Sequence, residues 1–429
     1  MTDHIVKGPL LIPSEDGGVA YHADGALAYD ASGILVFAGP WKKLQSELPK
    51  DSPRPRVSDG VMLPPLLDLH THIPQHPIRG RFAEGVSPDA PGGVLLNGLK
   101  RNVFPAETKC NARDYARKVI EAFLADTRAN GIVGGAAFMT VSAAATEIAL
   151  EILPDTWSVG LVMMNQNCPD DLRSDEKNVE ADIIRLATQF GRRFIVTDRF
   201  AVAVNSSLRR VGSNLAKRFG LRTQTHLNEQ LAEKHFVENK LYPDADSYTD
   251  VYLRDGLLQQ ECILAHCIHM RPEEWRMVTD AGAVIAHCPT SNLMLASGVM
   301  PLDEVRRHKI PFAIATDVGA SPTVSMLAEM RRFLDVHAGR SMVTPGEALF
   351  RATLAPARIL GLDEQVGRLD VGRPASFIEA APVRPLSPGE SADDVILALL
   401  PEDPDNPPPT VARVTLNGKA AFQRSRHHA

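Results

Sequence analysis

Residues 62–72, MLPPLLDLHTH, form an apolar run that ends in two histidines. A short, continuous apolar run of this kind is typical of a strand that is buried in a parallel sheet. Side chains alternate between the two faces of a strand, so His70 and His72 point to the same side. Two imidazoles on one side can bind the same divalent metal ion. The segment therefore predicts a buried strand with a metal site at its carboxyl end.

Seven further apolar runs follow, and helical segments separate several of them. The runs are IVGGAAF (132–138), SVGLVMM (158–164), RFIVTD (193–198), RTQTHL (222–227), CILAHC (262–267), AVIAHC (283–288) and PFAIATD (311–317). Helices are expected at 176–190, 206–219 and 272–281, because each segment is followed directly by a glycine that can end a helix. Eight strands that alternate with helices predict an α/β fold, a (β/α)8 TIM barrel.

The two ends of the chain have a different pattern, with short strand-like runs joined by turns. ILVFAGP (34–40) is such a run near the beginning. TVARVTLNGKAAF (410–422) near the end contains Asn-Gly, the preferred sequence of a two-residue hairpin turn. We expect residues 1–62 and 376–429 to form one small accessory β-sandwich. Residues 63–375 would then form the barrel.

Charge and composition argue against several classes of protein. The formal net charge is -6 at pH 7 and no basic tract occurs, so no nucleic-acid partner is expected. No apolar run is long enough to span a bilayer, and the first residues lack the apolar core of a signal peptide. The five cysteines form no Cys-x-x-Cys pair, which favours a reducing compartment. We therefore expect a cytoplasmic protein that does not bind a membrane.

Polar side chains stand at the carboxyl ends of five of the eight predicted strands. In a parallel barrel these ends share one rim, where reactive side chains lie. The residues are His70, His72, His226, His266, His287 and Asp317. Imidazole and carboxylate together suit Zn²⁺, with Fe²⁺ as the alternative. Three histidines and one carboxylate leave a position for a water molecule, whose pKa the metal lowers to ~7.

Three further features of this rim bear on the chemistry. Glu229 follows His226 by three residues and can carry a proton from the water to a leaving group, the alternative being an exposed glutamate at a helix start. His266 is either a ligand of a second metal or a hydrogen-bonding partner of the water or substrate. Residues 197–199, TDR, provide no lysine to bridge two metals, which favours a single ion. For His287 a structural and a functional role are both open.

The motifs of this rim resemble those of the amidohydrolase superfamily, in its aminohydrolase and chlorohydrolase branch. The motifs are PPLLDLHTH (64–72), THLNE (225–229), LAHC (264–267), HCPTSNLMLASG (287–298) and ATDVGASPTVSML (315–327). Other segments resemble the guanine deaminases of that branch. They are FPAE (104–107), MMNQNCPDDLR (163–173), VTDRFAV (196–202) and ENKLYPDADSYTDVYLRDGLL (238–258). The resemblance extends over most of the chain between residues 60 and 375.

The resemblance implies a role for each matching residue. One zinc ion per chain would be bound by His70, His72, His226 and Asp317. Catalysis would use Glu229 as the proton shuttle, His266 to orient the water, and Asp317. The purine ring of the substrate would be contacted by Gln75, Arg199, Phe200 and His266. The alternative for Arg199 is an ion pair with Asp198 or another acid, and that for Gln75 is a surface position. The resemblance also implies a homodimer.

The sequence departs from the family pattern around the predicted pocket. Asp198 stands where a proline precedes the arginine, His76 stands where an aromatic residue is common, and residues 319–321 read Gly-Ala-Ser instead of Ala-Gly-Gly. We expect a hydrolytic deaminase of a small heterocyclic base, and the main prediction is the conversion of guanine to xanthine and ammonia. Deamination or dechlorination of a pterin, isocytosine or triazine ring is the first alternative. A non-catalytic homologue is the second, and it is disfavoured because every ligand and Glu229 are present.

Overall fold

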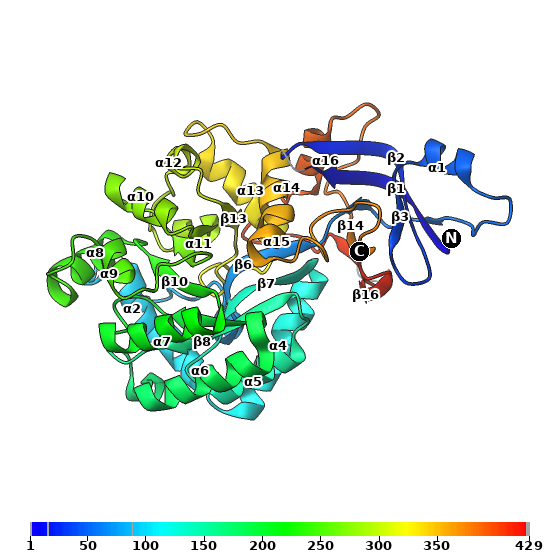
Figure 1. The fold of residues 1–429 in the computed structure, drawn as a ribbon. Coiled ribbons are helices and arrows are strands. Elements are labelled where there is room, and N and C mark those ends of the chain that lie inside the picture. Colours follow the sequence, from blue (N-terminus) through cyan, green and yellow to red (C-terminus); the bar gives the residue numbers. More distant parts are fainter. Residues whose placement is uncertain (1, 15–16, 88, 426–429) are drawn as a thin grey trace. The chain divides into compact units, whose positions relative to one another are not determined.

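The computed structural model describes residues 2–14, 17–87 and 89–425 (Figure 1). The chain divides into two compact units. One contains Asp68–Leu124 and Gly134–Val324, and the other contains Met1–Leu67, Ala125–Val133 and Ser325–Ala429. The limits at 62/63 and 375/376 that the sequence suggests for the domains stay a prediction.

Eight parallel strands form the barrel in chain order, as the sequence predicts. They are β6 (Leu66–His72), β7 (Ile132–Phe138), β8 (Trp157–Met163), β9 (Phe194–Asp198), β10 (Thr223–Leu227), β11 (Ile263–His266), β12 (Val284–His287) and β13 (Phe312–Ile314). The residues after β13 close the ring onto β6. The amide of Asp317 donates to the carbonyl of His70 at 2.9 Å, and the amide of His72 donates to the carbonyl of Val318 at 2.7 Å.

Almost every residue of the eight strands is buried, which explains why the strands appear in the sequence as continuous apolar runs. Two glycines allow neighbouring strands to approach closely. A Cβ atom at Gly135 of β7 would collide with the carbonyl oxygen of Asp68, and one at Gly160 of β8 would collide with the hydroxyl of Thr197. Larger residues at these positions would force the strands apart.

The predicted helices are present between the strands. They are α6 (Glu176–Phe190), α7 (Ser206–Phe219) and α10 (Pro272–Asp280), and the same unit holds α2 (Gly93–Gly98), α3 (Phe104–Lys109), α5 (Ala143–Ile152), α8 (Leu231–Phe236), α9 (Tyr248–Arg254), α11 (Pro289–Met294) and α12 (Leu302–Arg307). The side chains of Asp175 and Asn205 accept hydrogen bonds from the first turns of α6 and α7. Gly220 ends α7 with a φ of 63°, a left-handed conformation that costs glycine least.

Strands from both ends of the chain form a second sheet, as predicted, in the order β16-β15-β14-β5-β1-β2-β3 with β4 beside β1. They are β1 (His4–Pro13), β2 (Val19–Tyr29), β3 (Leu35–Pro40), β4 (Arg56–Val57), β5 (Val61–Leu63), β14 (Phe377–Ala380), β15 (Val411–Leu416) and β16 (Lys419–Gln423). Asn417 and Gly418 join β15 to β16 and have positive φ angles of 49° and 74°, which confirms the hairpin.

Apolar side chains are buried in two clusters around this second sheet. Consecutive residues of β1 contribute to different clusters, Ile5 to one and Val6 to the other, because neighbouring side chains of a strand point to opposite faces. Leu44 of α1 (Trp41–Glu47) joins the cluster of Ile5. The same unit contains α13 (Met326–His337), α14 (Pro345–Ala352), α15 (Leu354–Leu360) and α16 (Ala392–Leu399). Within the described part of the chain, no helix is long and apolar enough to cross a membrane.

Candidate active site

The histidines and the aspartate that the sequence singled out meet at one end of the barrel. His70 and His72 come from β6, His226 from β10, and Asp317 follows β13. One ligand atom of each of these four residues lies within 4.8 Å of the others. The barrel therefore brings together, from three separate parts of the sequence, the four residues predicted to bind the metal.

The distances between these ligand atoms fit a tetrahedral metal site. Nε2 of His72 lies 3.2 Å from Nε2 of His226, and Oδ1 of Asp317 lies 3.2 Å from Nε2 of both His70 and His72. Ligands at zinc bond lengths in a tetrahedron are about 3.3 Å apart. Nδ1 of the buried His70 has no hydrogen-bonding partner among the described residues, and its Nε2 contacts only the carboxylate of Asp317. These residues fit a single divalent ion.

The protonation of the cluster also suits a cation. Burial lowers the pKa of His72 to about 3 and holds that of His226 well below its ordinary value, so both imidazoles are neutral and can bind metal. Burial raises the pKa of Asp317, but hydrogen bonds from His70 and His72 outweigh it and hold the pKa well below its ordinary value. Neutral imidazole and ionised carboxylate are the forms of these side chains that bind Zn²⁺ or Fe²⁺.

Neighbouring groups orient two of the ligands. Nδ1 of His226 lies 2.6 Å from the carbonyl oxygen of Arg199, so it donates its proton there and leaves Nε2 free to bind a metal. The hydroxyl of Ser291 donates to Oδ2 of Asp317 at 2.6 Å, which leaves Oδ1 toward the histidines. Asp68 accepts from both the amide and the hydroxyl of Thr316, and so ties β6 to the residue before Asp317.

Glu229 is buried beside the cluster. The hydroxyl of Ser297 donates to its Oε1 at 3.0 Å, and its Oε2 lies 3.5 Å from Nε2 of His266. Burial, together with the charge of Asp317, raises the pKa of Glu229 to about 8 against the hydrogen bond from Ser297. A carboxyl group with a pKa near the working pH can both take up and release a proton.

His266 and His287 differ in their surroundings. Nδ1 of His266 lies 2.8 Å from Oδ1 of Asn292, and its Nε2 lies 3.9 Å from Oδ2 of Asp317. A second possible metal group among the described residues is formed by His266, Cys288 and Asp317. His287 belongs to neither group and is buried at the end of β12. The roles of His266 and His287 therefore stay predictions.

Gln75, Arg199 and Phe200, three of the four residues predicted to contact the base, line a small cavity of about 20 Å³ next to the cluster, whereas the fourth, His266, is not among its lining residues. The lining residues are His72, Gln75, Phe82, Leu95, Leu99, Arg199, Phe200, His226, Glu229, Leu295 and Asp317. The cavity has space for about one water molecule. Gln75, Arg199 and Phe200 are buried, so Gln75 is not a surface residue.

A buried carboxylate that sequence reasoning did not single out holds two of these residues. Nη1 of Arg199 donates to both oxygens of Glu107 at 2.7 Å, and Nε2 of Gln75 donates to Oε1 of Glu107 at 3.0 Å. The amide of Gly319 donates to Oε1 of Gln75 at 3.3 Å. The only signal for Glu107 in the sequence was its place in FPAE (104–107), a segment that resembles the family.

Asp198 pairs with Arg209 and not with Arg199. Nε of Arg209 donates to Asp198 at 2.8 Å, and its Nη1 donates to Asp255 at 2.8 Å. All three side chains are buried, and the hydroxyl of Thr225 lies 3.3 Å from the second oxygen of Asp198. This departure from the family pattern therefore serves a structural ion-pair network. Arg199 remains directed to Glu107 in the pocket.

Comparison with known proteins agrees with this site. The profile of the Amidohydrolase family matches residues 61–420, so the chain belongs to the amidohydrolase family and is a hydrolase. Members of this family are metal-dependent.

Several of the relatives to which the chain is similar are guanine deaminases. The chain is 29% identical to the guanine deaminase of Escherichia coli (strain K12), with 90% of this chain and 89% of that protein covered. It is 32% identical to the guanine deaminase of Mus musculus, with 72% and 70% covered. The solved structure "E. coli Guanine Deaminase" matches with a TM-score of 0.86 and 27% identity, covering 98% of this chain and 99% of that one.

Proposed function

We propose that this chain deaminates guanine to xanthine and ammonia, with one zinc ion held by His70, His72, His226 and Asp317. The observation that carries the proposal is the position of Glu229 between Ser297 and His266, next to a cluster that fits one metal. Similarity to guanine deaminases over 90% of the chain supports the substrate. The resemblance also supports a homodimer, and the absence of a membrane-spanning helix in the described residues is consistent with a cytoplasmic enzyme.

The reaction joins water to the ring carbon that bears the exocyclic amine and breaks the bond to that amine. When bound, the metal supplies a positive charge that makes a water molecule acidic near neutral pH. Glu229 takes a proton from the water and passes it to the neighbouring ring nitrogen. It then passes the second proton of the water to the departing amine, so the balance is guanine plus water to xanthine plus ammonia. His266 directs Nε2 toward Glu229 and orients the attacking oxygen.

Recognition of the ring uses the donors that Glu107 leaves unoccupied. Nη1 of Arg199 is bound to Glu107, so Nε and Nη2 remain to donate to the ring carbonyl. Gln75 has one donor and one acceptor position left after its bonds to Glu107 and Gly319. Phe200 borders the ring plane. Adenine carries an amine where guanine carries this carbonyl, so its donor would face the donors of Arg199.

A substrate panel tests the proposed reaction. We expect kcat/KM for guanine to exceed that for adenine by a wide margin, because the buried donors of Arg199 lose their acceptor with adenine. Pterin, isocytosine and ammeline, which keep a ring carbonyl, complete the panel as the alternative substrates. Ammonia release and loss of the ring absorbance are measured with one preparation of the enzyme. High turnover of another ring with guanine inert would replace guanine as the substrate, and the residues around Asp198 and Gly319 would be examined first. No ammonia from any ring in zinc-loaded enzyme would support the non-catalytic alternative.

A second experiment tests the metal site. Elemental analysis of protein prepared without chelator should give close to one Zn or Fe per chain, because the described cluster fits one ion. Asp317→Asn should lose most of the metal or the activity, since an amide is a poorer ligand than a carboxylate. Asp303→Asn on the exposed face of α12 is the matched control and should keep both. Two ions per chain that are both needed for turnover would contradict the single-metal site, and would assign His266 to the second ion.

A further inference from the structure

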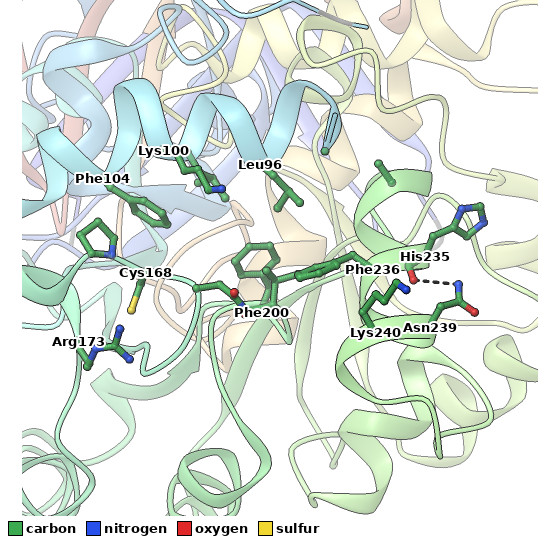
Figure 2. A pocket seen from close by; sticks show the side chains of 16 residues that line it. Leu96, Lys100, Phe104, Cys168, Arg173, Phe200, His235, Phe236, Asn239 and Lys240 are labelled. Carbon is green, nitrogen blue, oxygen red and sulfur yellow. Dashed lines mark hydrogen bonds between the residues drawn. The ribbon is translucent and has the colours of Figure 1, made fainter. Parts of the chain in front are cut away.

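A second, much larger cavity of about 770 Å³ lies outside the candidate active site (Figure 2). Its walls are the helical segment with Leu96, Lys100 and Phe104, the residues around Cys168 and Arg173, and the segment with Phe236 and Lys240. Leu99 and Phe200 line both this outer cavity and the small inner one. The outer cavity is therefore directly adjacent to the pocket for the base.

The charge of the outer cavity is positive, although the chain as a whole carries -6. Lys100, Arg173 and Lys240 line it, and none of the aspartates and glutamates that the structure describes does. Arg173 is partly neutralised by Asp170, 3.3 Å away. Within the part of the chain that the structure describes, neither the ammonium group of Lys100 nor that of Lys240 has a hydrogen-bonding or ion-pair partner. Two lysines without partners at one cavity favour an anionic ligand.

The same cavity presents aromatic surface. Phe236 is only partly buried, on the segment that carries Lys240, and offers an accessible ring, whereas Phe104 and Phe200 line the wall with rings that are only 3% and 4% exposed. Figure 2 shows the ring of Phe200 between the ring of Phe104 and that of Phe236. Aromatic side chains of this kind stack on the flat faces of nucleobases, with little regard for which base is present. The cavity thus combines a surface for a flat ring with cations for an acidic group.

We propose that the outer cavity binds a purine mononucleotide, with the ring against Phe236 and the phosphate on Lys100 and Lys240. Free guanine is neutral and does not account for these cations. Glu229 and the predicted metal ligands His72, His226 and Asp317 line the inner cavity and not the outer one, so a ring held in the outer cavity is not a substrate. Because Phe200 and Leu99 border both cavities, an occupied outer cavity blocks the path of guanine to the inner one. The expected block of guanine entry rests on the proposed function, whereas nucleotide binding does not.

Binding is tested by calorimetry on the zinc-loaded protein with guanosine 5′-monophosphate. Guanosine lacks the phosphate and ribose 5-phosphate lacks the ring. The affinity of each should therefore be at least about tenfold lower than that of the nucleotide, a loss on the scale of one or two ion pairs. Adenosine 5′-monophosphate should bind within a fewfold of the guanine nucleotide, because stacking does not read the edge of the base. Absence of nucleotide binding at millimolar concentration would overturn the proposal. Equal binding of inorganic phosphate would also overturn it, since the ring would then contribute nothing.

Variants locate the site. Lys100→Ala/Lys240→Ala should weaken nucleotide binding about tenfold, and the matched pair Lys118→Ala/Lys177→Ala on exposed positions outside the cavity should leave it unchanged. The nucleotide should inhibit guanine turnover competitively in the wild type, with an inhibition constant that rises about tenfold in Lys100→Ala/Lys240→Ala. Unchanged binding in that variant would overturn the assignment to this cavity. If guanine proves not to be a substrate, the calorimetric result still decides whether the nucleotide binds.

Discussion

Glu229→Gln should retain the metal and lose kcat by roughly 10²–10⁴-fold or more, the usual contribution of general acid–base catalysis. The amide has nearly the same shape and can still accept a hydrogen bond from Ser297, which lies 3.0 Å from Oε1 in the native protein. It has no proton to take up or release, so the transfer from water to ring nitrogen to amine stops. Steady-state kinetics with metal analysis of the same sample measure this result.

The control for this variant is Glu121→Gln, because Glu121 lies on α4 (Arg113–Ala129) and is exposed. It should keep full activity. Because binding of the base does not require a charge on Glu229, KM for guanine should change much less than kcat. Near-normal turnover in metal-replete Glu229→Gln would rule out the proton shuttle and direct attention to His266, whose Nε2 lies 3.5 Å from the same carboxylate.

Arg199→Leu should combine a large loss of guanine turnover with a large loss of stability. Arg199 and Glu107 are both buried, and Nη1 of Arg199 donates to both carboxylate oxygens at 2.7 Å. Removal of the guanidinium leaves an unpaired charge in the interior, which costs about 3–5 kcal/mol. The same substitution removes the donors proposed for the ring carbonyl, so kcat/KM for guanine should fall as well. Chemical denaturation and kinetics measure the two effects separately.

The double variant Arg199→Leu/Glu107→Gln separates recognition from folding. Glutamine at 107 is neutral and can still accept the hydrogen bond from Gln75, so most of the stability should return. The activity should not return, because the ring donors are still missing. Recovery of guanine turnover together with stability would show that Arg199 acts only as the ion-pair partner of Glu107, and would remove it from the pocket for the base.

Much of the fold could be predicted because its signals are local in the sequence. The apolar run of β6 with His70 and His72 two residues apart predicted a buried strand and the direction of both imidazoles, since side chains alternate along a strand. Glycines directly after residues 190 and 219 predicted the ends of α6 and α7, because a residue with positive φ stops a helix. The same rules placed the hairpin at Asn417 and Gly418.

The candidate metal cluster could be predicted for a different reason. Parallel strands of one barrel share a rim, so residues that end separate strands must lie near each other once the barrel is recognised. His226 and Asp317 became candidates in this way together with His266 and His287, and the family resemblance implied that the first two are the ligands. The structure brings His226 and Asp317 to His72 within the distances of one metal site. Their roles, and those of Glu229 and His266, stay predictions until the variants are measured.

The sequence by itself thus determined the order of strands and helices, the barrel, and the group of side chains on its rim. Only the tertiary structure decided which partner each side chain finds. Glu107 is 92 residues from Arg199, and Ser297 is 68 residues from Glu229. No periodicity or spacing links residues this far apart, because these contacts depend on how loops after different strands pack over the rim. The same packing decides which acid pairs with Arg199, and whether the lysines of the outer cavity meet a carboxylate or remain available to a ligand.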